Sequence, residues 1–134
     1  MPGFHPPVIT ALYAGLLGLV SIALALGAGK ARADTGISIG DGGNLTVIVA
    51  MRRHANFVEN VPLVLILLGV LELNGVSNAA LHGIGGVLFV SRVLHPIGLR
   101  AENSTVLRSI GAIGTTLVTL VAAVWAVAVF FQAS

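Results

Sequence analysis

The sequence predicts an all-α integral membrane protein, a single domain built as a bundle of four transmembrane helices. Hydrophobic residues make up 56% of its 134 residues and charged residues only 9%, and the mean hydropathy is +1.00. Soluble domains carry about 25% charged residues, so this composition excludes that class. Polar segments with glycines separate four apolar stretches, each long enough to cross a hydrocarbon core of about 30 Å.

The first predicted helix covers residues 8–29 and contains no charged residue. Lys30 and Arg32 follow this apolar run, whereas a signal peptide carries its positive charges in front of it, so we expect a retained membrane helix. The following segment, up to residue 44, contains the turn signal Asp41-Gly42 and is predicted as a polar loop.

The second predicted helix covers residues 44–73, with Asp41 or Asn44 as its cap and a kink at Pro62. A short turn makes the third helix, residues 78–96, its antiparallel neighbour. The fourth helix is expected over residues 105–131, after a polar connection that supplies Asn103 or Ser104 as a cap.

Basic residues predict the orientation in the membrane. Lys30, Arg32 and Arg100 belong to the segments after the first and third helices, and the termini and central turn carry no lysine or arginine. The positive-inside rule therefore places these two segments on the cytoplasmic side.

Polar residues gather in the cytoplasmic half of the bundle. Arg52, Asn56 and Glu59 recur at i, i+4 and i+7, which places them on one face of the second helix. Three more polar residues are expected at the same depth on the third and fourth helices: Arg92, His95 and Arg108. Charges inside a membrane segment are costly and usually face a functional site. The excess of arginine predicts binding of a polyanionic small molecule, because guanidinium groups bind carboxylates through two parallel hydrogen bonds.

Other interpretations of these residues remain open. Arg52 and Glu59 can form a structural ion pair, Arg53 can extend its charge to the membrane surface, and His54 can simply pack. The four histidines lack metal-ligand spacing, so no metal site is expected, and the absence of cysteine excludes a thiol nucleophile of the protein's own. A net charge of +2 without a basic stripe argues against nucleic-acid binding. The nearly apolar first and fourth helices argue against a transport path.

The pattern Arg52-x3-Asn56-x2-Glu59-x2-Pro62-Leu63 resembles the second-helix signature of the MAPEG family (membrane-associated proteins in eicosanoid and glutathione metabolism). The resemblance covers nearly the whole chain and is strongest to the bacterial branch. It implies a homotrimer of four-helix subunits in the bacterial inner membrane, surrounded by lipid. It further implies that glutathione binds between neighbouring subunits near the cytoplasmic side.

The resemblance also implies roles for individual residues. Eight positions correspond to those that hold or flank glutathione in the family: Arg52, Arg53, His54, Asn56, Glu59, Asn60, Arg92 and His95. Arg108 corresponds to the arginine thought to activate the glutathione thiol, and Ser109 follows it as in the prostaglandin E synthase branch. The implied activity is that of a glutathione transferase or peroxidase acting on lipophilic electrophiles, a detoxification reaction.

One departure from the family pattern favours an alternative. Several eukaryotic members carry tyrosines just after the third-helix arginine, where this chain has Pro96 and Leu99. The alternative is a non-catalytic membrane protein that binds a lipid headgroup or another anion at the same basic site.

Overall fold

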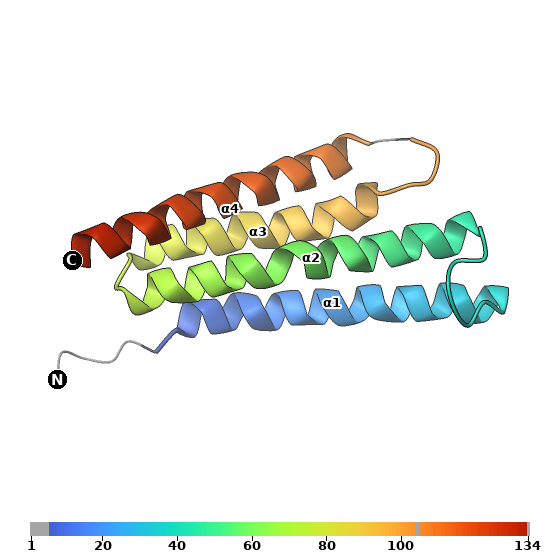
Figure 1. Ribbon diagram of the computed structural model, residues 1–134, viewed down its shortest axis with the longest axis horizontal. Helices are drawn as coiled ribbons and strands as arrows, with labels where there is room; N and C mark the ends of the chain where they lie inside the picture. The colour runs from blue at the N-terminus through green and yellow to red at the C-terminus, as the bar shows by residue number, and fades with distance from the viewer. Residues whose placement is uncertain (1–5, 104, 134) are drawn as a thin grey trace.

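A computed structural model describes residues 6–103 and 105–133, which form a bundle of antiparallel α-helices (Figure 1). Its four helices are α1 (Val8–Thr35), α2 (Leu45–Leu73), α3 (Asn78–Gly98) and α4 (Val106–Ala133). Each is long and apolar enough to cross a membrane. This confirms the predicted all-α fold with four membrane spans.

The helices follow one another across the bundle in chain order (Figure 1). The most extensive packing joins α3 to α4 and α1 to α2, and within the described residues no Cα atom of α1 lies within 8 Å of a Cα atom of α4. The start of α1, the α2–α3 turn and the end of α4 lie at one end of the bundle, and the two longer connections lie at the other. The predicted grouping of the connections is therefore confirmed.

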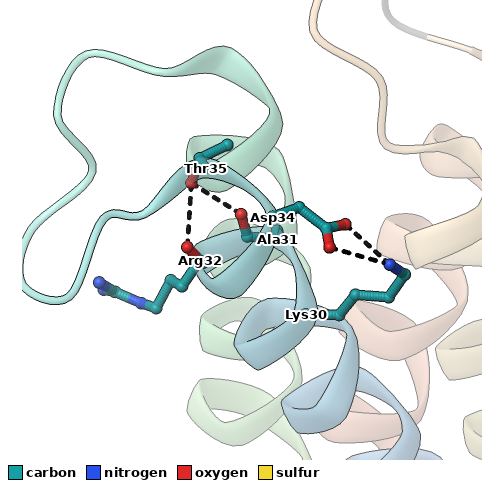
Figure 2. A network of polar contacts seen from close by, with 5 residues as sticks. All are labelled: Lys30, Ala31, Arg32, Asp34 and Thr35. Carbon is teal, nitrogen blue, oxygen red and sulfur yellow. Dashed lines mark hydrogen bonds and ion pairs between the residues drawn. The ribbon is translucent and has the colours of Figure 1, made fainter.

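The first helix is longer than the sequence predicted, because it continues through the basic residues to Thr35 instead of ending at residue 29. Alanines alternate with polar residues here, and the Lys30 ammonium pairs with the Asp34 carboxylate at 2.8 Å, one turn away (Figure 2). Alanine has the highest helix propensity, and such i, i+4 pairs add a few tenths of a kcal/mol. The helix ends at Gly36, which has the positive φ of 70° typical of a C-terminal cap.

The end of the bundle that carries the two longer connections is called the loop-bearing end. The helices that begin there, α2 and α4, are capped by short polar side chains. Asn44 caps α2, because its Oδ1 accepts hydrogen bonds from the Thr46 and Val47 amides, at 2.9 and 3.3 Å. At the start of α4, Thr105 accepts from the Arg108 amide at 3.3 Å and donates to the Gly98 carbonyl at 2.7 Å. Thr105 thus ties α4 to the end of α3. The prediction of Asn103 as the cap is wrong, since Thr105 accepts the hydrogen bond, and Ser104 lies outside the described residues.

The start of α1 has a cap that comes from another helix. Pro7 precedes α1 and provides no side-chain cap, and the first turn has no acidic residue. The buried carboxylate of Glu72, near the end of α2, accepts hydrogen bonds from the amides of Ile9 and Thr10, at 2.8 and 2.7 Å. It satisfies two amides that the helix itself leaves unpaired and binds the positive end of the helix dipole.

The core lies between the helices and is mostly aliphatic, with Leu68 on α2, Leu88 on α3 and Ala122 on α4 fully buried. Glycines bring α3 and α4 close together. A Cβ on Gly111 would lie 2.6 Å from the Ser91 carbonyl oxygen, so only glycine fits there without a shift of the backbone. Many leucines, isoleucines and valines on the outer faces are exposed, as expected for helices surrounded by lipid.

Candidate functional site

One face of α2 carries the first residues of the site. The segment is helical as predicted, so Arg52, Asn56 and Glu59 share this face. Arg52 and Glu59 are exposed and Asn56 between them is half-buried. The closest distance between the Arg52 guanidinium and the Glu59 carboxylate is 3.9 Å, and both side chains are more than half exposed. An exposed pair at this distance contributes about 0–1 kcal/mol to stability. Both charged groups therefore remain available to a ligand.

Arg92 of α3 joins this face to two other helices. It is 2% exposed, and it donates from Nη1 to Asn56 Oδ1 at 2.8 Å and from Nη2 to the Gly111 carbonyl of α4 at 3.0 Å. Its Nε has no hydrogen-bond partner among the described residues. No carboxylate of the described residues pairs with this buried cation. A buried charge held only by neutral acceptors is costly, which favours a binding role for the surrounding site.

The hydrogen bond from Arg92 also orients Asn56. Because the amide oxygen faces the guanidinium donor, the amide nitrogen of Asn56 must point away from Arg92. Its two N–H groups have no acceptor among the described residues. Arg92 therefore fixes the orientation of the Asn56 amide, and the two N–H groups of Asn56 are available to donate hydrogen bonds to a ligand.

Three of the predicted site residues lie near this face but differ in what they contact. Arg53 points elsewhere, because its Nε and Nη2 donate to the Leu99 carbonyl at 3.2 and 2.8 Å. Asn60 donates to the Asn56 carbonyl of its own helix at 2.8 Å. His54 is half-buried. Their roles in ligand binding stay predictions.

The ends of α3 and α4 supply the remaining predicted residues. His95 is 6% exposed and packs against Gly111, where an added Cβ would lie 2.8 Å from the His95 backbone nitrogen. Arg108 and Ser109 are exposed in the first turns of α4. The Arg108 guanidinium has no hydrogen-bond acceptor among the described residues, and the Arg108 backbone lies against Gly98 at the end of α3. The close packing of α3 on α4 thus places Arg108 beside the residues at the end of α3.

Gly111 allows the close approach of α3 and α4 and also supplies a backbone acceptor to the site, which the sequence does not predict. Its carbonyl accepts from Arg92 and also from Thr115 Oγ1, at 2.8 Å. No sequence pattern predicts such a backbone acceptor, because the identity of the accepting carbonyl depends on which turn of α4 lies opposite Arg92. The site as a whole offers arginine donors, one free amide and one carboxylate, which suits a ligand with several carboxylates and one ammonium group.

Comparison with known proteins identifies the family to which this chain is similar. A sequence model of the MAPEG family matches residues 10–128, a range that includes every predicted site residue. The inner membrane protein YecN of Escherichia coli strain K12 is 32% identical over 91 residues, which are 68% of this chain and 70% of YecN. YecN of Escherichia coli O6:H1 strain CFT073 matches equally well. No solved structure matches this chain. The four apolar helices and the similarity to YecN place the chain in the inner membrane as an integral protein.

Proposed function

This chain belongs to the MAPEG family, and from that membership and the geometry of its polar site we propose that it binds glutathione and transfers it to lipophilic electrophiles. The observation that carries the proposal is the hydrogen bond from Arg92 to Asn56. It orients an amide donor on the same face of α2 as an exposed arginine and an exposed glutamate. Burying the Arg92 charge to orient Asn56 is costly, and binding of a ligand at this face gives a reason for that cost.

The charges of the site match those of the tripeptide. Glutathione carries two carboxylates and one ammonium group. Arg52 binds one carboxylate through its guanidinium fork, and Glu59 accepts hydrogen bonds from the ammonium group. Asn56 donates from its amide nitrogen to a peptide carbonyl. The loose contact between Arg52 and Glu59 leaves room for the ligand to separate them.

Arg108 and Ser109 act on the sulfur. Glutathione supplies a thiol with a reference pKa near 8.5, and a guanidinium beside it favours the thiolate, the nucleophilic form. Arg108 stabilises that thiolate while the proton leaves to solvent, and the Ser109 hydroxyl donates a hydrogen bond to it. With an aryl chloride, a carbon–sulfur bond forms and chloride leaves. With a lipid hydroperoxide, two glutathione molecules are oxidised to the disulfide, and the products are an alcohol and water.

The exposure of these residues supports two further parts of the proposal. Ile110 and Ile113, on the turns after Arg108, are at least half exposed, so an apolar substrate can approach Arg108 from the lipid. Arg52, Glu59 and Arg108 lie on the surface of the single chain. A neighbouring subunit of a homotrimer would cover them and enclose the ligand, with the site on the cytoplasmic side.

Calorimetric titration of the detergent-purified protein with glutathione tests the binding step. Arg52→Ala is expected to weaken binding at least tenfold, because a charge-assisted hydrogen bond is worth about 1.5–3 kcal/mol. Arg32→Ala is the matched control, since Arg32 lies at the same end of the bundle but contacts the Ser38 carbonyl and Met51 sulfur instead. Absence of binding to the unaltered protein at millimolar glutathione would refute the proposal.

The chemical step is tested separately with a chloronitrobenzene substrate. Arg108→Ala should abolish conjugation while glutathione binding and helix content persist. Unchanged turnover in Arg108→Ala would remove this residue from the mechanism. Glutathione binding by a protein without any turnover would support the alternative of a non-catalytic anion-binding protein, which the absence of a tyrosine at Pro96 and Leu99 favours.

A further inference from the structure

A cavity of about 590 Å³ opens at the loop-bearing end of the bundle, among the end of α1, the start of α2 and the connection after α3. Neither Arg52, Asn56 nor Glu59 lines it, so it is separate from the face described above. Five charged residues line this cavity, which we call the loop-end cavity: Lys30, Asp34, Arg53, Arg100 and Glu102. The rest of its lining is mostly apolar and includes Leu45, Val49 and Ala50.

The charged groups of the loop-end cavity are only partly used. Lys30 and Asp34 pair with each other. Arg53 donates from Nε and Nη2 to Leu99, which leaves Nη1 without an acceptor among the described residues. Arg100 and Glu102 are exposed, and neither forms an ion pair within the described part of the chain. The cavity therefore presents two available guanidinium groups and one available carboxylate.

The cavity lies at the depth of the lipid headgroups. Along α1, Lys30 is about 33 Å from Val8, and along α2, Arg53 is about 30 Å from Leu73, at 1.5 Å per residue. The hydrocarbon core is about 30 Å thick. α1 begins and α2 ends at the opposite end of the bundle. A membrane whose far boundary lies at that end would place Lys30 and Arg53 at the near boundary between hydrocarbon and headgroups.

A narrower groove leads from this cavity toward the middle of the membrane. A second cavity of about 200 Å³ is lined by Ala23, Leu24, Gly27, Ala50 and Arg53, and it shares the last three with the loop-end cavity. No atom lies within 4 Å of where a Cβ on Gly27 would be. The two cavities therefore form one path, charged at the headgroup level and apolar below it.

We propose that this path binds a membrane phospholipid with an amine headgroup. Arg53 Nη1 and Arg100 bind the phosphate, Glu102 accepts hydrogen bonds from the ammonium group, and one acyl chain lies along Gly27 and Ala23 between α1 and α2. A headgroup with one negative and one positive charge matches a wall that offers both signs. The site is separate from the glutathione contacts proposed above, because none of those residues lines the path: Arg52, Asn56, Glu59, Arg108 and Ser109.

Native mass spectrometry of the detergent-purified full chain, titrated with phosphatidylethanolamine, tests this proposal. Arg100→Gln should weaken lipid binding about tenfold through the loss of a charge-assisted hydrogen bond. The charge control is Arg32→Gln, which removes a cation at the same end that does not line the cavity and should bind lipid as the unaltered protein does. Circular dichroism of each variant verifies that the helices form.

A pair of glycine variants tests the acyl groove. Gly27→Leu fills the groove, and Gly29→Leu is its control, because Gly29 is exposed on the same helix, has no atom within 4 Å and does not line the path. Leucine has a higher helix propensity than glycine, so both variants should fold. Only Gly27→Leu is expected to weaken lipid binding, by about tenfold or more. This is the change in affinity expected when the acyl chain loses its apolar contacts with the groove.

Several results would overturn the proposal. Unchanged lipid binding in Gly27→Leu, or an equal loss in Gly29→Leu, would remove the acyl chain from the groove. Equal binding of phosphatidylglycerol would contradict the role of Glu102, and equal binding of phosphoethanolamine without acyl chains would reduce the site to one for a soluble anion. Displacement of the lipid by glutathione would assign the loop-end cavity to the glutathione site.

Discussion

Replacing Glu72 with glutamine should loosen the start of α1 from the end of α2. The two carboxylate oxygens each accept one hydrogen bond, from the amides of Ile9 and Thr10 at 2.8 and 2.7 Å. Glutamine has nearly the same shape, but it presents one oxygen and one N–H₂ group. The N–H₂ group would face a backbone N–H, so one of the two hydrogen bonds is lost and the other becomes neutral.

The expected magnitude follows from these two bonds. Hydrogen bonds to a charged group are worth about 1.5–3 kcal/mol each, and a neutral bond about 0.5–1.5 kcal/mol. Exchanging two charged bonds for one neutral bond should therefore lower the free energy of unfolding by about 2–5 kcal/mol. Glu72 is only 6% exposed, so solvent compensates little of the loss.

Denaturation in mixed micelles, followed by circular dichroism, measures this change. Glu59→Gln is the matched control, because it is the same substitution on the same helix at a side chain that is 54% exposed and 3.9 Å from its partner. Its expected effect is about 0–1 kcal/mol. A loss in Glu72→Gln no greater than in Glu59→Gln would refute the view that Glu72 caps α1.

Two further predictions concern the contacts that hold the polar site. Gly111→Ala should destabilise the bundle by about 1–3 kcal/mol, because its Cβ would meet the Ser91 carbonyl oxygen at 2.6 Å. In the same unfolding assay Gly18→Ala, which meets no atom within 4 Å, should be neutral or stabilising. Arg92→Lys cannot reach Asn56 and Gly111 together, so it should weaken glutathione binding about tenfold in calorimetry, the value of one lost hydrogen bond. If Arg92→Lys lowers the free energy of unfolding but leaves glutathione binding unchanged, Arg92 contributes to packing only.

Much of the fold could be predicted because membrane spans depend on composition and length. The four apolar stretches, the short turn before α3 and the cap at Asn44 are local properties of the chain. The sequence predicts too early an end for α1, because basic residues after an apolar run are typical of a loop, whereas Lys30 and Asp34 stabilise the helix by pairing one turn apart. The Arg52–Asn56–Glu59 face also follows from local spacing alone, since 3.6 residues per turn sets which side chains share a side.

Contacts between helices could not be predicted in the same way. The sequence by itself determined that this is a four-helix membrane protein with arginines, an amide and a carboxylate at one depth, because hydropathy and periodicity are properties of single segments. Only the tertiary structure decided that Arg92 supports Asn56, that Arg53 points away from Arg52, and that Glu72 caps α1 from a distance of 62 residues in the chain. These outcomes depend on the rotation and shift of each helix against its neighbours. Close contacts at glycines such as Gly111 set that register, and no single segment contains the information.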